Sequence, residues 1–137
     1  MTREFFDSFA TMGDFSLYLA TAFILTWLFV VIYIRITPYR ELALIRAGNS
    51  AAALSLGGAL LGFVMVLAAV IVHSVSLVDL MLWGVVAAIT QMIAYAAVRL
   101  MIADIANGIE QNHLSHGIFL CACSLASGML TAACVAT

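Results

Sequence analysis

The sequence predicts an all-α membrane protein with four transmembrane helices, built from two parallel two-helix repeats. The first observation is composition: 66% of the 137 residues are hydrophobic and only 9% are charged, whereas soluble domains average about 45–50% apolar and about 25% charged residues. The second is four apolar stretches of about 20 residues, each long enough to cross a ~30 Å hydrocarbon core. The third is a pattern of small residues that occurs twice. We therefore expect a single domain, residues 1–137, embedded in a lipid bilayer.

The N-terminal stretch, residues 1–14, is predicted to form a short interfacial helix, because its phenylalanines and Met12 share one helical face between charged residues. Span one follows from Ser16 to Ile36. Pro38 ends this span, since proline cannot donate a hydrogen bond into the preceding turn.

The first connection is predicted to hold a short surface helix over Pro38–Ala47, with Thr37 as its N-cap. Gly48 suits the left-handed conformation that closes such a helix. Asn49 suits the N-cap position of the next helix, which is span two, Ser50–Val72.

A tight polar turn separates spans two and three. Ser76 and Asp79 form a capping box that predicts the start of span three, about 79–102. Residues 103–114 are rich in amides and charges and are predicted to be a polar connection. Span four is expected from about 115 to 137.

The two halves of the chain, residues 15–73 and 77–137, are interpreted as an internal duplication. Three pairs of small residues coincide when the halves are aligned: Gly62 with Gly128, Gly58 with Ser124, and Ala51 with Gly117. A nearby register also places Arg35 on Arg99. Because each unit crosses the membrane twice, the two repeats should have the same orientation and be related by an axis along the membrane normal.

The small residues of the repeated pattern predict a helix-packing surface. Glycines one turn apart, as in Gly58-x-x-x-Gly62, let a second helix approach closely. The residues assigned to this surface are Ser55, Gly58, Ala59, Gly62, Ser124 and Gly128. Two interpretations stay open and can both hold: packing of span two against span four within one chain, or a subunit interface in a homo-oligomer.

Polar residues near mid-membrane are Thr26, Thr90 and Gln91. A buried amide needs a partner, so Gln91 is predicted either to bond Thr26 or Ser55 across helices or to line a narrow polar path. The middle of every predicted span lacks Asp, Glu, Lys, Arg and His. Proton- and ion-coupled transporters commonly carry such residues, so coupled transport is disfavoured.

Chemistry-bearing residues are few. His113 and His116, three residues apart near Glu110, could face one metal ion or respond to pH, but further ligands are not evident, so we predict no metal site and no cofactor. No nucleophile–base grouping or pair of carboxylates stands in a polar context, so we predict that the protein is not an enzyme. The chain has no Lys and a net charge of −2, which makes nucleic acid an unsuitable partner.

Arginine placement predicts the orientation. Most arginines flank or occupy the first and third connections, and only Arg3 lies at the other side. The positive-inside rule therefore places these connections in the cytoplasm and both termini outside it. The charged residues assigned to the cytoplasmic loops are Arg40, Glu41, Arg46, Arg99, Asp104 and Glu110.

Three stretches together resemble the YjfL-like family of bacterial inner-membrane proteins, known as domain of unknown function 350. They are ITPYRELALIRAGNSAAALSLGGALLGF, SVSLVDLMLWGVVAAITQMIAYAAVRL and GIFLCACSLASGMLTAAC. The resemblance implies a multi-pass protein of the bacterial inner (plasma) membrane with four spans built from a two-span unit, and it implies no activity. It also implies a genetic context of membrane-remodelling and envelope-stress proteins. Related proteins often carry proline where this chain has Val64-Met65-Val66, which argues against a kink there.

Two functions are predicted from these features. The first is a self-associating membrane scaffold or anchoring subunit, which binds a cytoplasmic membrane-remodelling partner involved in envelope maintenance. The alternative is an oligomeric channel for ions or small solutes, with Thr26, Thr90 and Gln91 lining a path between subunits.

Overall fold

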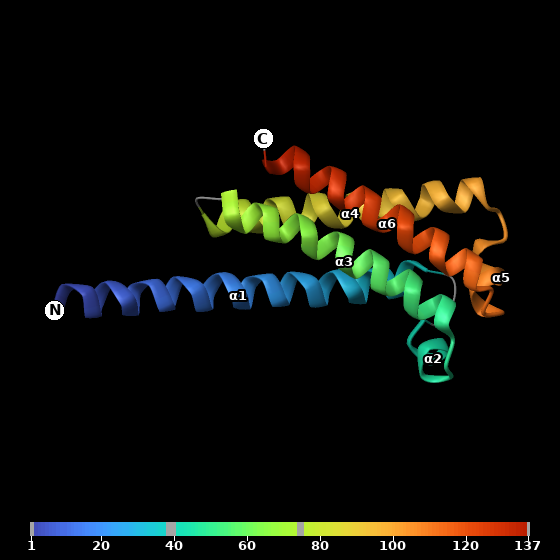
Figure 1. The fold of residues 1–137 in the computed structure, drawn as a ribbon, viewed down its shortest axis with the longest axis horizontal. Coiled ribbons are helices and arrows are strands. Elements are labelled where there is room, and N and C mark those ends of the chain that lie inside the picture. The colour runs from blue at the N-terminus through green and yellow to red at the C-terminus, as the bar shows by residue number, and fades with distance from the viewer. Residues whose placement is uncertain (1, 38–40, 74–75, 137) are drawn as a thin grey trace.

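The computed structural model describes residues 2–37, 41–73 and 76–136, and within these ranges it is helical with no strand. Four of its helices are long and apolar enough to cross a membrane, which confirms the predicted class. The helices are α1 (Thr2–Ile36), α2 (Glu41–Arg46), α3 (Ser50–His73), α4 (Leu77–Met101), α5 (Ile105–Glu110) and α6 (Leu114–Ala136). The short helices α2 and α5 lie at the same end of the bundle (Figure 1).

Helix α3 is the centre of the bundle. It contacts each of the other helices, and its most extensive contact is with α6. Half of the residues in its most apolar 18-residue stretch are buried. The corresponding share is 11% for α1, 22% for α4 and 17% for α6. Helices α3 and α6 both start at the end that carries α2 and α5, so they run in the same direction (Figure 1). The core of the molecule is therefore built around a parallel helix pair.

Helix α1 differs from the prediction, because the interfacial helix and span one are a single continuous helix, Thr2–Ile36. Gly13 is the one weak helix former between the two predicted parts, and a glycine inside a helix costs only about 1 kcal/mol. That cost is smaller than the cost of interrupting several backbone hydrogen bonds. At 1.5 Å per residue α1 is about 52 Å long, and it extends well past the other helices (Figure 1).

Aromatic side chains hold the C-terminal half of α1 against the bundle. Phe29 stacks on Phe63 of α3 with ring centroids 4.4 Å apart, and Tyr33 meets Tyr95 of α4 edge-on at 5.8 Å. Pairs of this kind contribute about 0.5–1.5 kcal/mol beyond the area that they bury. These contacts fix the inner face of α1 to α3 and α4.

Thr37, the predicted N-cap of the short helix, makes its described hydrogen bonds to the end of α1. The Thr37 amide donates to the Tyr33 carbonyl at 3.0 Å, and its hydroxyl donates to the Ile34 carbonyl at 3.1 Å. Thr37 therefore closes α1, and α2 is described from Glu41 onward. The hydroxyl donates into the preceding turn because that turn carries carbonyls left without an amide partner. The predicted start of the short helix at Pro38 lies outside the described residues.

The passage from α2 to α3 has the geometry expected of its sequence. Gly48 has φ +89°, a left-handed conformation that glycine adopts without steric cost. Asn49 stands at the N-cap of α3, where its Oδ1 accepts a hydrogen bond from the Ala52 amide at 2.9 Å.

A reciprocal pair of asparagines ties α3 to α5. The Asn49 Nδ2 donates to the Ile109 carbonyl at 2.7 Å and to the Glu110 carbonyl at 3.3 Å. In return, the Asn112 Oδ1 accepts a hydrogen bond from the Ala51 amide at 3.0 Å. Each side chain thus satisfies backbone groups that a helix terminus leaves unpaired.

In the second half of the chain the structure confirms one prediction and corrects another. Ser76 is the N-cap of α4, and its Oγ accepts a hydrogen bond from the Asp79 amide at 3.3 Å. Residues 103–114 are not a plain polar connection, since they contain helix α5. Ile105 and Ile109 of α5 are fully buried, and this anchoring explains why the segment folds although it is rich in polar residues.

We expect Asn49→Ala to lower the free energy of unfolding by about 1–3 kcal/mol, because it removes both the cap of α3 and the tie to α5. Asn49→Ser keeps a capping oxygen but cannot reach the Ile109 carbonyl, so its loss should be smaller. Unfolding followed by circular dichroism in detergent measures both. Asn107→Ala, an exposed change on α5, is the matched control. Equal stability of Asn49→Ala and the control would contradict the role of the tie.

Candidate functional site: the seam between α3 and α6 and the charged end

The small residues of the repeated pattern bring α3 and α6 into backbone contact. A Cβ placed on Gly117 would lie 2.6 Å from the Cα of Ala51, and a Cβ on Gly128 would collide with the Cα and carbonyl oxygen of Gly62. Real Cβ atoms do not approach other atoms so closely, so glycine is required at both positions. We call this line of contacts the α3–α6 seam.

The glycines of α3 meet α6 in the same way. A Cβ on Gly58 would lie 2.6 Å from the Cα of Cys121, and a Cβ on Gly62 would lie 2.5 Å from the carbonyl oxygen of Ser124. Such close approach maximises van der Waals contact, which is the main attraction between helices in lipid. Six residues assigned to packing lie in buried positions at or beside this seam: Ser55, Gly58, Ala59, Gly62, Ser124 and Gly128.

The seam has a regular register. Ala51 faces Gly117 and Gly62 faces Gly128, so the partners in both pairs are 66 residues apart in the chain. Both of these pairs also coincide when the two halves of the sequence are aligned. Gly58 departs from this register, since it meets Cys121 and not its aligned partner Ser124.

Gln91 of α4 lies against the seam and is 1% exposed. Its Nε2 donates to the carbonyl oxygen of Ser124 at 3.2 Å. The Gln91 Oε1 and the Ser124 Oγ are buried and find no hydrogen-bond partner among the described residues. Gln91 therefore joins α4 to α6 from inside the bundle, and its amide does not face lipid.

The predicted partners of Gln91 were wrong. The hydroxyl of Thr26 donates to the Ala22 carbonyl, and the hydroxyl of Ser55 donates to the Ala52 carbonyl, each within its own helix. Thr90 likewise donates to a carbonyl of α4, four residues earlier. Short hydroxyl side chains reach a carbonyl one turn back more easily than a neighbouring helix, which leaves the Ser124 carbonyl as the partner of the amide.

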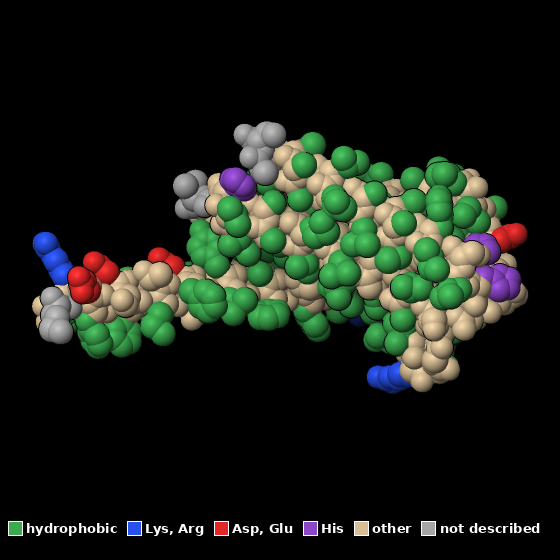
Figure 2. Space-filling model, in the orientation of Figure 1, with side chains coloured by type: hydrophobic (Ala, Val, Ile, Leu, Met, Phe, Trp, Pro, Cys, Tyr) green, Lys and Arg blue, Asp and Glu red, His purple; other side chains and the backbone are tan. Residues whose placement is uncertain are grey.

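Charged side chains gather at the end of the bundle that carries α2 and α5, which we call the charged end. Arg35 and Arg99 stand in the last turns of α1 and α4, and Arg46 ends α2. Asp104 precedes α5 and Glu110 ends it, and all five are exposed. Of the other two predicted loop residues, Arg40 lies outside the described residues and Glu41 begins α2. Figure 2 shows hydrophobic side chains over most of the visible face, with charged and histidine side chains at its two ends.

A polar hollow of about 330 Å³ opens at the charged end beside α5. Its lining includes Asp104, Gln111, His113 and His116. The two histidine rings lie 5.5 Å apart, and the His116 ring covers Gly108 so closely that a Cβ there would collide with it. Over residues 2–37, 41–73 and 76–136, no three side chains of the metal-ligating kinds come together.

The sequence analysis did not predict three contacts at the site. Asn112, which reaches the start of α3, has φ 59°, a left-handed conformation that asparagine tolerates. Cys121 supplies the surface that Gly58 meets, and His116 packs on Gly108. Asn112 could have been suspected, since an asparagine next to a helix end often caps it. The other two depend on the crossing of helices and leave no local pattern.

The sequence comparisons agree with this architecture. The family model described as Domain of Unknown Function (DUF350) matches residues 6–135. The chain belongs to this family. Two similar relatives are the UPF0719 inner membrane proteins YjfL of Escherichia coli strain K12 and of Escherichia coli O157:H7. Each is 35% identical over 121 residues, which cover 88% of this chain and 92% of the relative. No solved structure matches the chain.

Membership of the DUF350 family confirms the resemblance seen in the sequence. The relatives are named as inner-membrane proteins, and this chain has four helices of membrane-spanning length. It is therefore a membrane protein of the multi-pass, inner-membrane kind. In this DUF350 member α3 and α6 meet backbone to backbone along the α3–α6 seam.

We expect Gly62→Ala to destabilise the bundle by about 1–3 kcal/mol, because the added methyl group collides with the Ser124 carbonyl and the Gln91 amide. Gly57→Ala is the matched control. It lies on the same helix with nothing within 4 Å of its Cβ position, so it should be neutral or stabilise α3 by up to about 1 kcal/mol. Unfolding of both variants in detergent tests the seam, and equal effects would show that close packing at Gly62 is unimportant.

Proposed function

We propose that this protein is a non-enzymatic, self-associating scaffold or anchoring subunit of the bacterial inner membrane, which holds a cytoplasmic partner at the membrane surface. The observation that carries the proposal is the contrast between the sides of the bundle and its charged end. The sides are apolar and suited to lipid or other helices, and the exposed charges Arg46, Asp104 and Glu110 stand at the end that carries α2 and α5. A membrane-remodelling protein of the envelope-maintenance kind is the partner class that suits such an anchor.

The orientation follows from the arginines. With the charged end in the cytoplasm, α2 and α5 lie at the inner surface and both termini lie outside. Arg46, Asp104 and Glu110, one basic and two acidic side chains, then offer a mixed polar surface to a soluble protein. Rim charges of this kind set the specificity and the rate of association more than the affinity.

The parallel repeat is part of the proposal. Facing residues of α3 and α6 are separated by 66 residues at both Ala51–Gly117 and Gly62–Gly128. A duplicated two-helix unit gives this register directly, with an axis that passes between α3 and α6 along the membrane normal. Helix α1 departs from such symmetry, since it packs against α3 and α4.

The channel alternative lacks comparable support. It requires Gln91 to face a path between subunits, and Gln91 instead points into the bundle against the Ser124 carbonyl. The hydroxyls of Thr26 and Thr90 are taken up by carbonyls of their own helices. The residues that would line the path are therefore divided between interior and surface.

A topology measurement tests the orientation. Alkaline phosphatase fused after Thr137 should be active, because it folds only outside the cytoplasm, and green fluorescent protein at the same place should stay dark. Reporters inserted between Asn107 and Gly108 should give the reverse result. An active phosphatase in α5 would place the charged end outside and remove the proposed cytoplasmic surface.

The function is tested on the full chain extracted in a mild detergent. Native mass spectrometry should find a dimer or a larger assembly, together with a bound cytoplasmic protein. Charge reversal at the charged end, Arg46→Glu with Glu110→Arg, should release that protein, while Arg3→Glu at the opposite end should not. A strict monomer without a partner would overturn the proposal.

A further inference from the structure

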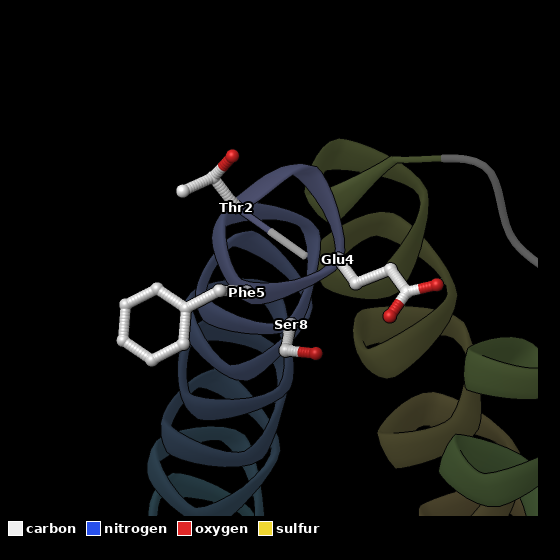
Figure 3. Close-up of a pocket in the computed structure, with 4 residues that line it drawn as sticks. All are labelled: Thr2, Glu4, Phe5 and Ser8. Carbon is white, nitrogen blue, oxygen red and sulfur yellow. The ribbon is translucent and has the colours of Figure 1, made fainter.

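The polar hollow at the charged end is built from several parts of the chain. Its volume is about 330 Å³, and its lining comes from α5, the residues on either side of α5 and the start of α6: Asp104, Asn107, Gly108, Gln111, His113 and His116. Ligand sites are concave places of this kind, where polar groups from different segments converge. At the opposite end of the molecule a second hollow is lined by residues of α1 alone, and these side chains leave the helix in different directions (Figure 3).

Close packing holds one wall of the hollow in place. The His113 amide donates to the Gly108 carbonyl at 2.7 Å. One face of the His116 ring lies on Gly108, because the ring atoms Cγ, Cδ2 and Nδ1 would each stand 2.7–2.8 Å from a Cβ there. The His113 ring lies beside it, with centroids 5.5 Å apart and planes at 35°. The His116 ring is thus a flat wall that is ordered before any ligand arrives, which lowers the entropy cost of binding.

The charge of this corner is negative. Asp104 supplies a carboxylate, and no arginine is among the described residues that line the hollow. The Asp104 side chain makes no cap hydrogen bond to α5, so the helix does not use its carboxylate. Glu110 ends α5, and no Arg or Lys follows Arg99 in the sequence. The amino end of α6 opposes these two full charges with only about half a unit of positive charge. The hollow therefore favours a cation.

The shape and chemistry of the lining select a guanidinium group among cations. Asn107 and Gln111 add amide oxygens to the Asp104 carboxylate, and the histidines add flat rings. A guanidinium is planar, stacks on flat rings and donates parallel hydrogen bonds to a carboxylate. An ammonium group is a compact point charge, so it gains less from a flat wall. The lining offers each of the partners that a guanidinium uses.

The openness of the hollow indicates where that guanidinium comes from. Most of the polar side chains of the lining are exposed, and His116 is half-buried. Sites for free small molecules enclose about 70–90% of the ligand surface, which this hollow cannot do. A side chain on another protein brings its own surroundings, which cover the open side when the two surfaces meet. The hollow therefore suits an arginine of a protein better than a free small molecule.

We propose that this hollow receives an arginine side chain of the cytoplasmic partner protein. Asp104 accepts hydrogen bonds from the guanidinium, and the His116 ring lies against its flat face. The inference rests on the proposed anchoring function and assigns the contact to the corner that carries α5. A basic segment of the partner is repelled from α2, where Arg46 is exposed, and attracted by Asp104 and Glu110. Charges arranged in this way fix the orientation of a partner.

Nuclear magnetic resonance of the full chain in detergent tests the site, because the three histidines report on both ends of the bundle. At constant pH, acetyl-arginine amide should shift the ring signals of His113 and His116 to saturation. His73, which ends α3 at the opposite end, should not respond. Acetyl-lysine amide should bind more weakly, and neutral acetyl-citrulline amide and inorganic phosphate should give no saturable shift. Lysine or citrulline binding as tightly as arginine, or saturation by phosphate, would overturn the site.

Two matched variants test whether the hollow itself is responsible. Asp104→Asn should weaken binding of acetyl-arginine amide about threefold to tenfold, because it removes the carboxylate from the lining. Glu110→Gln removes the same charge from the other end of α5, outside the lining, and should weaken binding by less than about twofold. Both side chains are exposed, so thermal unfolding of the bundle should be unchanged. Equal losses would show attraction to an acidic corner in general and would contradict the proposal.

Failure of this site and failure of the proposed function give different results. If acetyl-arginine amide binds but the purified chain carries no cytoplasmic protein, the anchoring function falls and the guanidinium site stands. If a cytoplasmic protein is bound and Asp104→Asn changes neither its retention nor the binding of acetyl-arginine amide, the site falls and the anchoring function stands.

Discussion

Backbone contact between α3 and α6 is the constraint on which the rest of the fold depends. In lipid the hydrophobic effect does not drive helices together, so the bundle relies on contact area and on the few polar bonds that its helices can form. Gly62 and Gly128 supply the contact by bringing two parallel helices together without intervening side chains. Helix α4 then covers the pair, and Gln91 adds the polar bond from its side. Helix α1 joins the bundle through a small set of aromatic contacts.

The asparagine pair at the charged end complements the seam. Asn49 and Asn112 each cap a helix terminus of the other segment, so the corner before α3 and the corner before α6 are fixed to one another. This fixes the heights at which α3 and α6 enter the membrane, and hence which small residues face each other. It also holds α5 at the surface, where Asp104 and Glu110 are exposed. The same bonds that set the register of the core thus shape the surface proposed to receive a partner.

Small and large apolar side chains have different places in this molecule. The small residues of α3 and α6 lie in the seam, where they fix a helix crossing within one chain. The large side chains of α1, such as Phe9 and Phe23, stay exposed on a helix that the bundle holds on one side.

The sequence by itself determined the class, the four spans, the caps at Asn49 and Ser76, and the small residues that meet, because each of these follows from composition or from residues adjacent in the chain. Local patterns failed where competing elements were close in energy: Gly13 was too weak a breaker to divide α1, and buried Ile105 and Ile109 turned a polar connection into α5. Only the tertiary structure decided that Gln91 bonds the Ser124 carbonyl, that Asn112 reaches α3, and that most large side chains of α1 stay exposed. Those outcomes depend on how helices distant in sequence cross, and the geometry of a crossing is a property of two surfaces together.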